Sequence, residues 1–276
     1  MEAYSFTDKE ALHWWKGTCG CLSLSTFIAL LIVYFTDTAI GFVPVSGTDF
    51  RTGGLTDEIG WEQVEHDDTL DASWVFVTLF AIASAVSGIY YCGLFLAPES
   101  WSGLKEQVEA NFNRHRWFRR GLTEPLLFVS VSYVASISNA FVITAVAVVT
   151  VLLNLNQSAN EAIYLGGASR ASGSLSWLPR IEFYGGATLA ALYVFVSWWV
   201  YYGTGDAAAG GLSGWVPATV FTVSILYLLF HLVAVNVYVS FAEGAYSWSK
   251  EYVYDVFEAL QLHLTVWFVI AGLNTA

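Results

Sequence analysis

Residues 117–155 read WFRRGLTEPLLFVSVSYVASISNAFVITAVAVVTVLLNL, and from Pro125 to Leu155 they include no charged side chain. As one helix this stretch would be roughly 58 Å long at 1.5 Å per residue, about twice the roughly 30 Å thickness of a bilayer's hydrocarbon layer. The Ser-Ile-Ser-Asn sequence at 136–139 interrupts it with small polar side chains that compete for backbone hydrogen bonds. The stretch therefore predicts two helices, 117–136 and 140–155.

The rest of the chain has the composition of a membrane protein. Of its 276 residues, 56% are hydrophobic and 12% are charged, whereas a soluble domain has about 25% charged residues. Five further apolar runs are each about long enough to cross a bilayer as a helix, namely 18–40, 74–96, 184–203, 216–238 and 253–273. Because these runs are continuous rather than alternating, helices are expected and not a barrel. The predicted fold class is all-α, a single domain that forms a seven-transmembrane-helix bundle, multi-pass in the cell membrane.

The distribution of basic residues predicts the orientation, because cytoplasmic segments of membrane proteins are enriched in Lys and Arg. With seven helices and the N-terminus inside, ten of the eleven basic residues fall inside and only Arg51 falls outside. A single helix over 117–155 would move Arg170, Arg180 and Lys250 outside, so the charge bias also favours two helices there. The C-terminus is then expected outside.

Three of the connecting loops carry specific expectations. The outer loop 45–73 is expected to form a turn or hairpin, because a Val-Pro-Val sequence and the Gly53-Gly54 pair occur near and within it. The inner loop 97–116 is expected to include a helical turn at 99–110. The inner loop 156–180 is rich in Ser and Gly and is expected to be mobile.

Several classes of function are not expected. The net charge of −12 argues against nucleic-acid binding, and an acidic surface with few lysines is typical of a haloarchaeal or other high-salt organism. The GLSG sequence at 211–214 matches the GxSG motif of intramembrane serine proteases, but His231 would lie about 27 Å along a straight helix from Ser213. No metal-binding or phosphate-binding motif is present. The chain is not expected to be an enzyme.

Ionisable residues inside the expected spans are costly in lipid and point to functional sites. They are Arg119, Arg120 and Glu124 in 117–136, His231 in 216–238, and Asp255, Glu258 and His263 in 253–273. Those near the inner ends of the helices could instead extend to the membrane surface. Glu124 follows Arg120 by four residues, a spacing that allows an ion pair within one helix. Asp255, Glu258 and Leu262 share one helix face, whereas His263 points about 100° away and could bind a backbone carbonyl.

Several segments resemble the heliorhodopsin family. Asn113, Arg116 and Trp117 are similar to the Asn-x-x-Arg-Trp segment that opens helix 3 in that family. Residues 230–236 (FHLVAVN) resemble the Phe-Asn-Ser-Phe-Ala-x-Asn stretch of its helix 6, and 253–272 keep the Val-Tyr, Trp and Ala-Gly frame of its helix 7. The resemblance covers essentially all seven helices. It implies a rhodopsin-like bundle of inverted topology and a homodimer.

At two positions the sequence departs from the family pattern. Heliorhodopsins bind retinal through a Schiff base on a helix 7 Lys five residues before the Trp, and this position is Leu262. Their counterion Glu follows the helix 3 Arg by three residues, and this position is Arg119. Lys250 is the only lysine expected near helix 7, at its cytoplasmic start. We therefore expect degenerate Schiff-base and counterion positions and no covalent retinal.

Arg119 needs an anion if it stays within the bundle. Glu258, one turn inward of Leu262 on the same face, or Glu124 can supply one. The alternative is that Arg119 reaches the inner surface while Glu258 is protonated. The other candidates for a polar core are His231, Asn236 and His263, and Trp267 is a candidate pocket aromatic.

The favoured function is a non-photochemical one: sensing, regulation or signalling through an unidentified protein partner. A photosensory protein that binds retinal or a carotenoid non-covalently is a first alternative. A proton or ion transporter that uses His231, Glu258 and His263 as a relay is a second.

Overall fold

A computed structural model describes residues 6–36, 43–52, 61–70, 72–109, 113–134, 140–165, 215–241 and 248–275. These residues form seven α-helices and one β-hairpin. The helices are α1 (Phe6–Phe35), α2 (Ala72–Leu96), α3 (Pro98–Glu109), α4 (Arg114–Val134), α5 (Ala140–Leu165), α7 (Trp215–Phe241) and α8 (Trp248–Thr275). The strands are β1 (Val43–Thr52) and β2 (Trp61–Leu70). The expected span at 184–203 lies outside the described residues.

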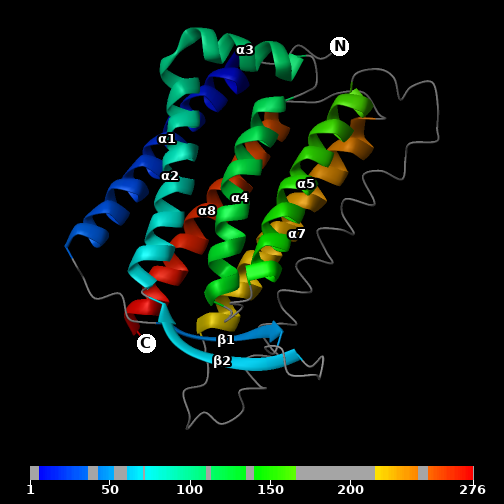
Figure 1. Ribbon diagram of the computed structural model, residues 1–276. Coiled ribbons are helices and arrows are strands. Elements are labelled where there is room, and N and C mark those ends of the chain that lie inside the picture. The colour runs from blue at the N-terminus through cyan, green and yellow to red at the C-terminus, as the bar shows by residue number, and fades with distance from the viewer. Residues whose placement is uncertain are drawn as a thin grey trace.

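The long helices are arranged as a bundle. In Figure 1, α1, α2, α4, α5, α7 and α8 run alongside one another, and the short helix α3 lies across one end of them. The N-terminus is at the α3 end of the bundle, and the C-terminus is at the opposite end, beside the hairpin. Three helical segments are long and apolar enough to cross a membrane: Glu10–Phe35, Val75–Leu96 and Glu251–Gly272. Ile143–Ala159 and Trp215–Phe230 are shorter apolar segments.

The chain reverses direction between α4 and α5. Trp117 contacts Glu161, and Glu124 contacts Asn154, so each contact pairs residues equally far from position 139. This register is that of two antiparallel helices, one on each side of the predicted break. α5, however, continues to Leu165, ten residues beyond the expected end. The expectation that the inner loop begins at 156 was wrong, because Gln157 and Glu161 are buried in the bundle.

The connection between α1 and α2 carries the expected hairpin. β1 and β2 pair antiparallel, from Val43 opposite Leu70 to Thr52 opposite Trp61. The described part of the chain is therefore a helical bundle with one two-stranded sheet, rather than purely α. The Gly53-Gly54 pair lies outside the described residues.

The first turns of α1 and the short helix α3 lie at the same end of the bundle (Figure 1). α1 begins twelve residues before the expected span, and this extension buries Leu12 and Lys16. α3 agrees with the helical turn expected at 99–110, and it buries Leu104 and Val108 in an apolar cluster with Leu12 and Trp117. Apolar side chains of α1, α3 and α4 thus pack together at this end of the bundle.

Candidate functional site

Nine charged side chains, each no more than 8% exposed, are buried together in the bundle. They are Lys16 of α1; Arg116, Arg119, Arg120 and Glu124 of α4; Glu161 of α5; and Glu251, Asp255 and Glu258 of α8. We call them the buried ion network. Removing a charge from water is costly unless it is paired and hydrogen-bonded, so the partners of each group define the site.

The three acids of α8 form the centre of the network. Glu251, Asp255 and Glu258 are spaced by four and three residues, which places them on one face of the helix. The Nζ atom of Lys16 lies 2.6 Å from Oδ2 of Asp255 and 3.6 Å from Oε1 of Glu251. Lys16 therefore bridges two of the three acids.

The start of α4 provides a second cation. Asn113 precedes the helix and its Oδ1 accepts a hydrogen bond from the backbone N–H of Arg116, at 3.1 Å, which is an N-cap interaction. Arg116 forms ion pairs with Glu251 and, at 2.7 Å, with Glu161. The indole N–H of Trp117 donates to the other oxygen of Glu161. The Asn-x-x-Arg-Trp segment thus caps α4 and connects it to α5 and α8.

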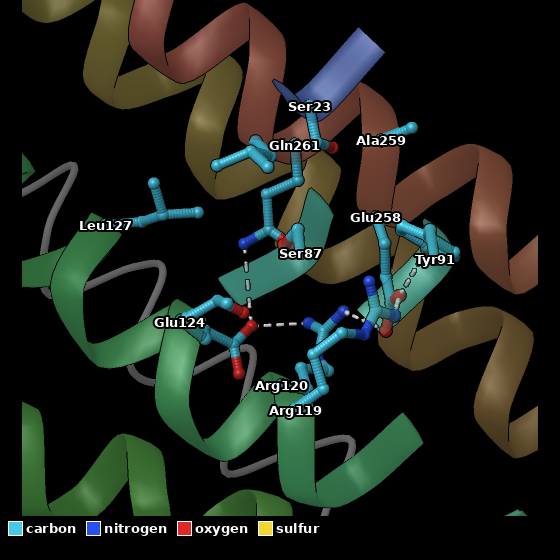
Figure 2. Close-up of a pocket in the computed structure, with 12 residues that line it drawn as sticks. Ser23, Ser87, Tyr91, Arg119, Arg120, Glu124, Leu127, Glu258, Ala259 and Gln261 are labelled. Carbon is cyan, nitrogen blue, oxygen red and sulfur yellow. Dashed lines mark hydrogen bonds and ion pairs between the residues drawn. The ribbon is translucent and has the colours of Figure 1, made fainter. Parts of the chain in front are cut away.

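The expected contact between Arg119 and Glu258 is present. Arg119 forms an ion pair with Glu258 across α4 and α8 (Figure 2). Its guanidinium lies over the rings of Tyr90 and Tyr91, 4.6 and 4.3 Å from their centroids. Arg119 is only 5% exposed. The side chain therefore stays in the bundle rather than extending to the inner surface.

Arg120 and Glu124 form the ion pair expected from their spacing in α4. The carboxylate of Glu124 also accepts hydrogen bonds from the amides of Asn154 on α5, at 2.5 Å, and Gln261 on α8, at 3.5 Å. Arg120 lies 3.3 Å from the centroid of Phe230 on α7. This pair accordingly brings together four helices.

A small cavity lies beside the ion pairs of Arg119 and Glu124. Its volume is about 20 Å³, enough for about one water molecule. Arg119, Arg120, Glu124 and Glu258 border it (Figure 2). Leu262 is also one of its lining residues. No metal is expected here, and among the described residues no group of three or more His, Cys, Asp or Glu is placed to hold one.

The remaining predicted site residues lie elsewhere. Leu262 is 5% exposed and belongs to an apolar cluster with Phe76 and Val266. Trp267 is 41% exposed and does not border the cavity, because five residues along a helix turn it about 140° away from Leu262. Nδ1 of His263 lies 3.2 Å from the hydroxyl of Thr26 on α1, not against a backbone carbonyl. His231 and Asn236 are in α7, and their side chains lie outside the description.

Sequence reasoning did not foresee four members of the network: Lys16, Arg116, Glu161 and Glu251. The expectation that Lys250 is the only lysine near helix 7 was wrong, since Lys16 reaches Asp255 from α1. One feature of the sequence could have indicated these cations. Glu251 and Asp255 are two acids four residues apart, and both would need cations if their face of the helix was buried.

Three apolar helices of membrane-crossing length around a buried ion network define a helical membrane protein. A search of models of known protein families finds no match to this chain, and a search of curated proteins finds none either.

Proposed function

We propose that this chain is a heliorhodopsin-like protein of the cell membrane that works without a retinal Schiff base, as a sensing or regulatory protein acting through a partner. The ion pair between Arg119 and Glu258 carries the proposal. Arg119 occupies the position that the resemblance assigns to the counterion carboxylate. A protonated Schiff base beside this guanidinium would be a like-charge pair in a medium of low dielectric constant, which is unfavourable.

The surroundings of Leu262 support the same proposal. This side chain provides no amine, and it packs in an apolar cluster. The cavity beside it has a volume of about 20 Å³, whereas pockets for organic ligands occupy about 300–1,000 Å³. A polyene would therefore require repacking of α4 and α8 around it.

The proposed topology has seven crossings, with the N-terminus inside. α5 ends beyond Glu161, which contacts Arg116 at the α3 end of the bundle, whereas α7 begins at the opposite end (Figure 1). An odd number of crossings must connect these two ends. The apolar run 184–203, outside the described residues, is proposed to be the remaining one. The homodimer rests on the resemblance alone.

Lys16 is the one described amine that could challenge the proposal, because it lies inside the bundle near α8. Its Nζ is held by Asp255 and Glu251, and two carboxylates keep an amine protonated. A protonated amine does not attack an aldehyde. Lys16 is therefore proposed to be a structural cation.

The test is a visible absorption spectrum of the protein purified from cells supplied with all-trans retinal, before and after hydroxylamine. We expect no visible band. A band that hydroxylamine removes would overturn the proposal, and a Lys16→Arg variant would then show whether Lys16 is the attachment site. A band that resists hydroxylamine would instead support the non-covalent pigment alternative. Light-independent proton uptake by vesicles carrying the purified protein would support the transporter.

A further inference from the structure

The arrangement of charges in the buried ion network points to a proton-binding site, and we propose that Asp255 and Glu258 share one proton through the hydroxyl of Tyr91. The inference uses only contacts between described residues. It does not depend on the heliorhodopsin resemblance or on the proposed function.

Acids and bases alternate along the network except at one place. Glu161, Arg116, Glu251, Lys16 and Asp255 contact one another in that order, so each acid is followed by a base. In the other branch, Glu258 pairs with both Arg119 and Arg120, and Arg120 pairs with Glu124. The two branches meet where Asp255 and Glu258 both contact the hydroxyl of Tyr91, so two acids are adjacent there and no described base forms an ion pair with both.

Tyr91 has too few hydrogens for both contacts. Its hydroxyl oxygen lies 3.3 Å from Oδ1 of Asp255 and 3.2 Å from Oε2 of Glu258. A phenol has one O–H, so with both carboxylates ionised this single hydrogen would have to be shared between them. The second contact becomes a full hydrogen bond when a carboxyl group provides the hydrogen and the phenol oxygen accepts it. One proton on this pair of acids therefore turns both contacts into hydrogen bonds.

The charge of the network requires the same number of protons. Its described members are five acids and four bases, so the formal charge with every acid ionised is −1. A net charge in a medium of low dielectric constant is costly, and adjacent like charges raise that cost. Binding one proton makes the network neutral.

The other three acids have no oxygen available for this proton. Each oxygen of Glu161, Glu251 and Glu124 accepts a hydrogen bond from a nitrogen donor. By contrast, Oε1 of Glu258 is buried and accepts no hydrogen bond. Oδ2 of Asp255 lies 2.6 Å from Nζ of Lys16, whereas Oε1 of Glu258 lies 3.8 Å from Nη1 of Arg120. Glu258 also borders the cavity, so a water there can exchange the proton.

Charged and titratable groups on the neighbouring helices affect how strongly the shared proton is held. These are Lys16 and Cys19 of α1, Tyr90 of α2, Arg116, Arg119, Arg120 and Glu124 of α4, Glu161 of α5, and Glu251 of α8. This set has four bases and three acids, and the proton-sharing pair of Asp255 and Glu258 adds a fourth negative charge. Loss of the proton would therefore leave one uncompensated negative charge among the described members of the network.

The experiment is infrared spectroscopy of the purified wild-type protein at neutral pH in H₂O and in D₂O. Exposed carboxyl groups are ionised at this pH, so a carbonyl stretching band of a protonated carboxyl reports a buried acid. We expect such a band, shifted by deuterium, with the intensity of one group per chain. Glu258→Gln and Asp255→Asn should each abolish it, because either change removes one of the two acids that share the proton and leaves four acids for four bases.

Glu106→Gln, at an exposed position of α3, is the matched control, since it makes the same chemical change at an acid outside the network. The band should remain in this variant, and Tyr91→Phe should shift it without removing it. Absence of the band from the wild-type protein would overturn the proposal, and this result requires no variant to fold. Retention of the band in both Glu258→Gln and Asp255→Asn would overturn it as well.

Discussion

Arg119 is a cation whose environment is determined by a few neighbours. It is 5% exposed and lies between the carboxylate of Glu258 and the rings of Tyr90 and Tyr91. Both the ion pair and the ring faces favour the charged guanidinium. The interaction stabilises the fold only as a unit, because either partner alone would be a buried charge without compensation.

Substitution of Arg119 and Glu258 should show this dependence. We expect Arg119→Ala and Glu258→Ala each to lower the free energy of unfolding by about 3–5 kcal/mol, and the double variant to lose less than the sum of the two. The measurement is denaturant or thermal unfolding of the purified protein in detergent. Arg119→Ala combined with Glu106→Ala, at an exposed position of α3, is the control and should give additive losses. Strictly additive losses for Arg119 and Glu258 would contradict the contact.

At the scale of single elements, α1 and α2 approach each other closely at glycines. A Cβ atom on Gly20 would lie 2.7 Å from Sγ and 3.0 Å from the backbone nitrogen of Cys92, and one on Gly88 would lie 2.7 Å from Leu24. Small residues allow helix backbones to pack closely in membranes, where the apolar lipid provides little drive for helix association. This packing positions Lys16 and Tyr91 at the network.

Gly20→Ala should therefore destabilise the protein, by about 1–3 kcal/mol, because the backbone of α2 has to move to accommodate the methyl group. Gly93→Ala is the matched control in α2, since a Cβ there would meet no atom within 4 Å. It should leave the stability unchanged or raise it by up to about 1 kcal/mol, as alanine is the better helix former. Thermal unfolding of both variants measures the difference. Equal effects would mean that the close approach is unimportant.

At the scale of the whole molecule, the network changes how the positive-inside count is interpreted. Four of the ten basic residues counted inside, Lys16, Arg116, Arg119 and Arg120, are buried in ion pairs. Six others are still counted on the inner side, namely Lys9, Lys105, Arg114, Arg170, Arg180 and Lys250. Only Arg51, in β1, is counted on the outer side. Arg170 and Arg180 lie outside the described residues. When the four buried basic residues are left out, the count of Lys and Arg still favours an N-terminus on the inner side.

Labelling with a membrane-impermeant thiol reagent tests this orientation. In a background with the three native cysteines replaced by alanine, Thr48→Cys in β1 should react in intact cells. Ser102→Cys in α3, at the opposite end of the bundle, should react only after the membrane is opened. The reverse pattern would invert the topology. Reaction of both sites in intact cells would contradict the separation of the two ends by a membrane.

Patterns that are local in the sequence determined much of the fold. Polar residues at 136–139 marked the reversal between α4 and α5, and the Arg120–Glu124 ion pair followed from helical spacing. Glycines and a proline near the outer loop indicated the hairpin, because backbone conformation there depends on neighbouring residues. The contact of Arg119 with Glu258 was anticipated as one of several alternatives.

The tertiary structure alone decided which of the distant charges meet. Lys16 and Asp255 are 239 positions apart, and Arg116 and Glu161 are 45 apart. Such pairs depend on how far each helix extends, how it is rotated about its axis and which helix packs beside it, and none of these appears in the sequence of a single segment. The meeting of Asp255 and Glu258 at Tyr91 likewise arises only when α2 and α8 come together, because one hydroxyl on one helix then faces two acids on the other.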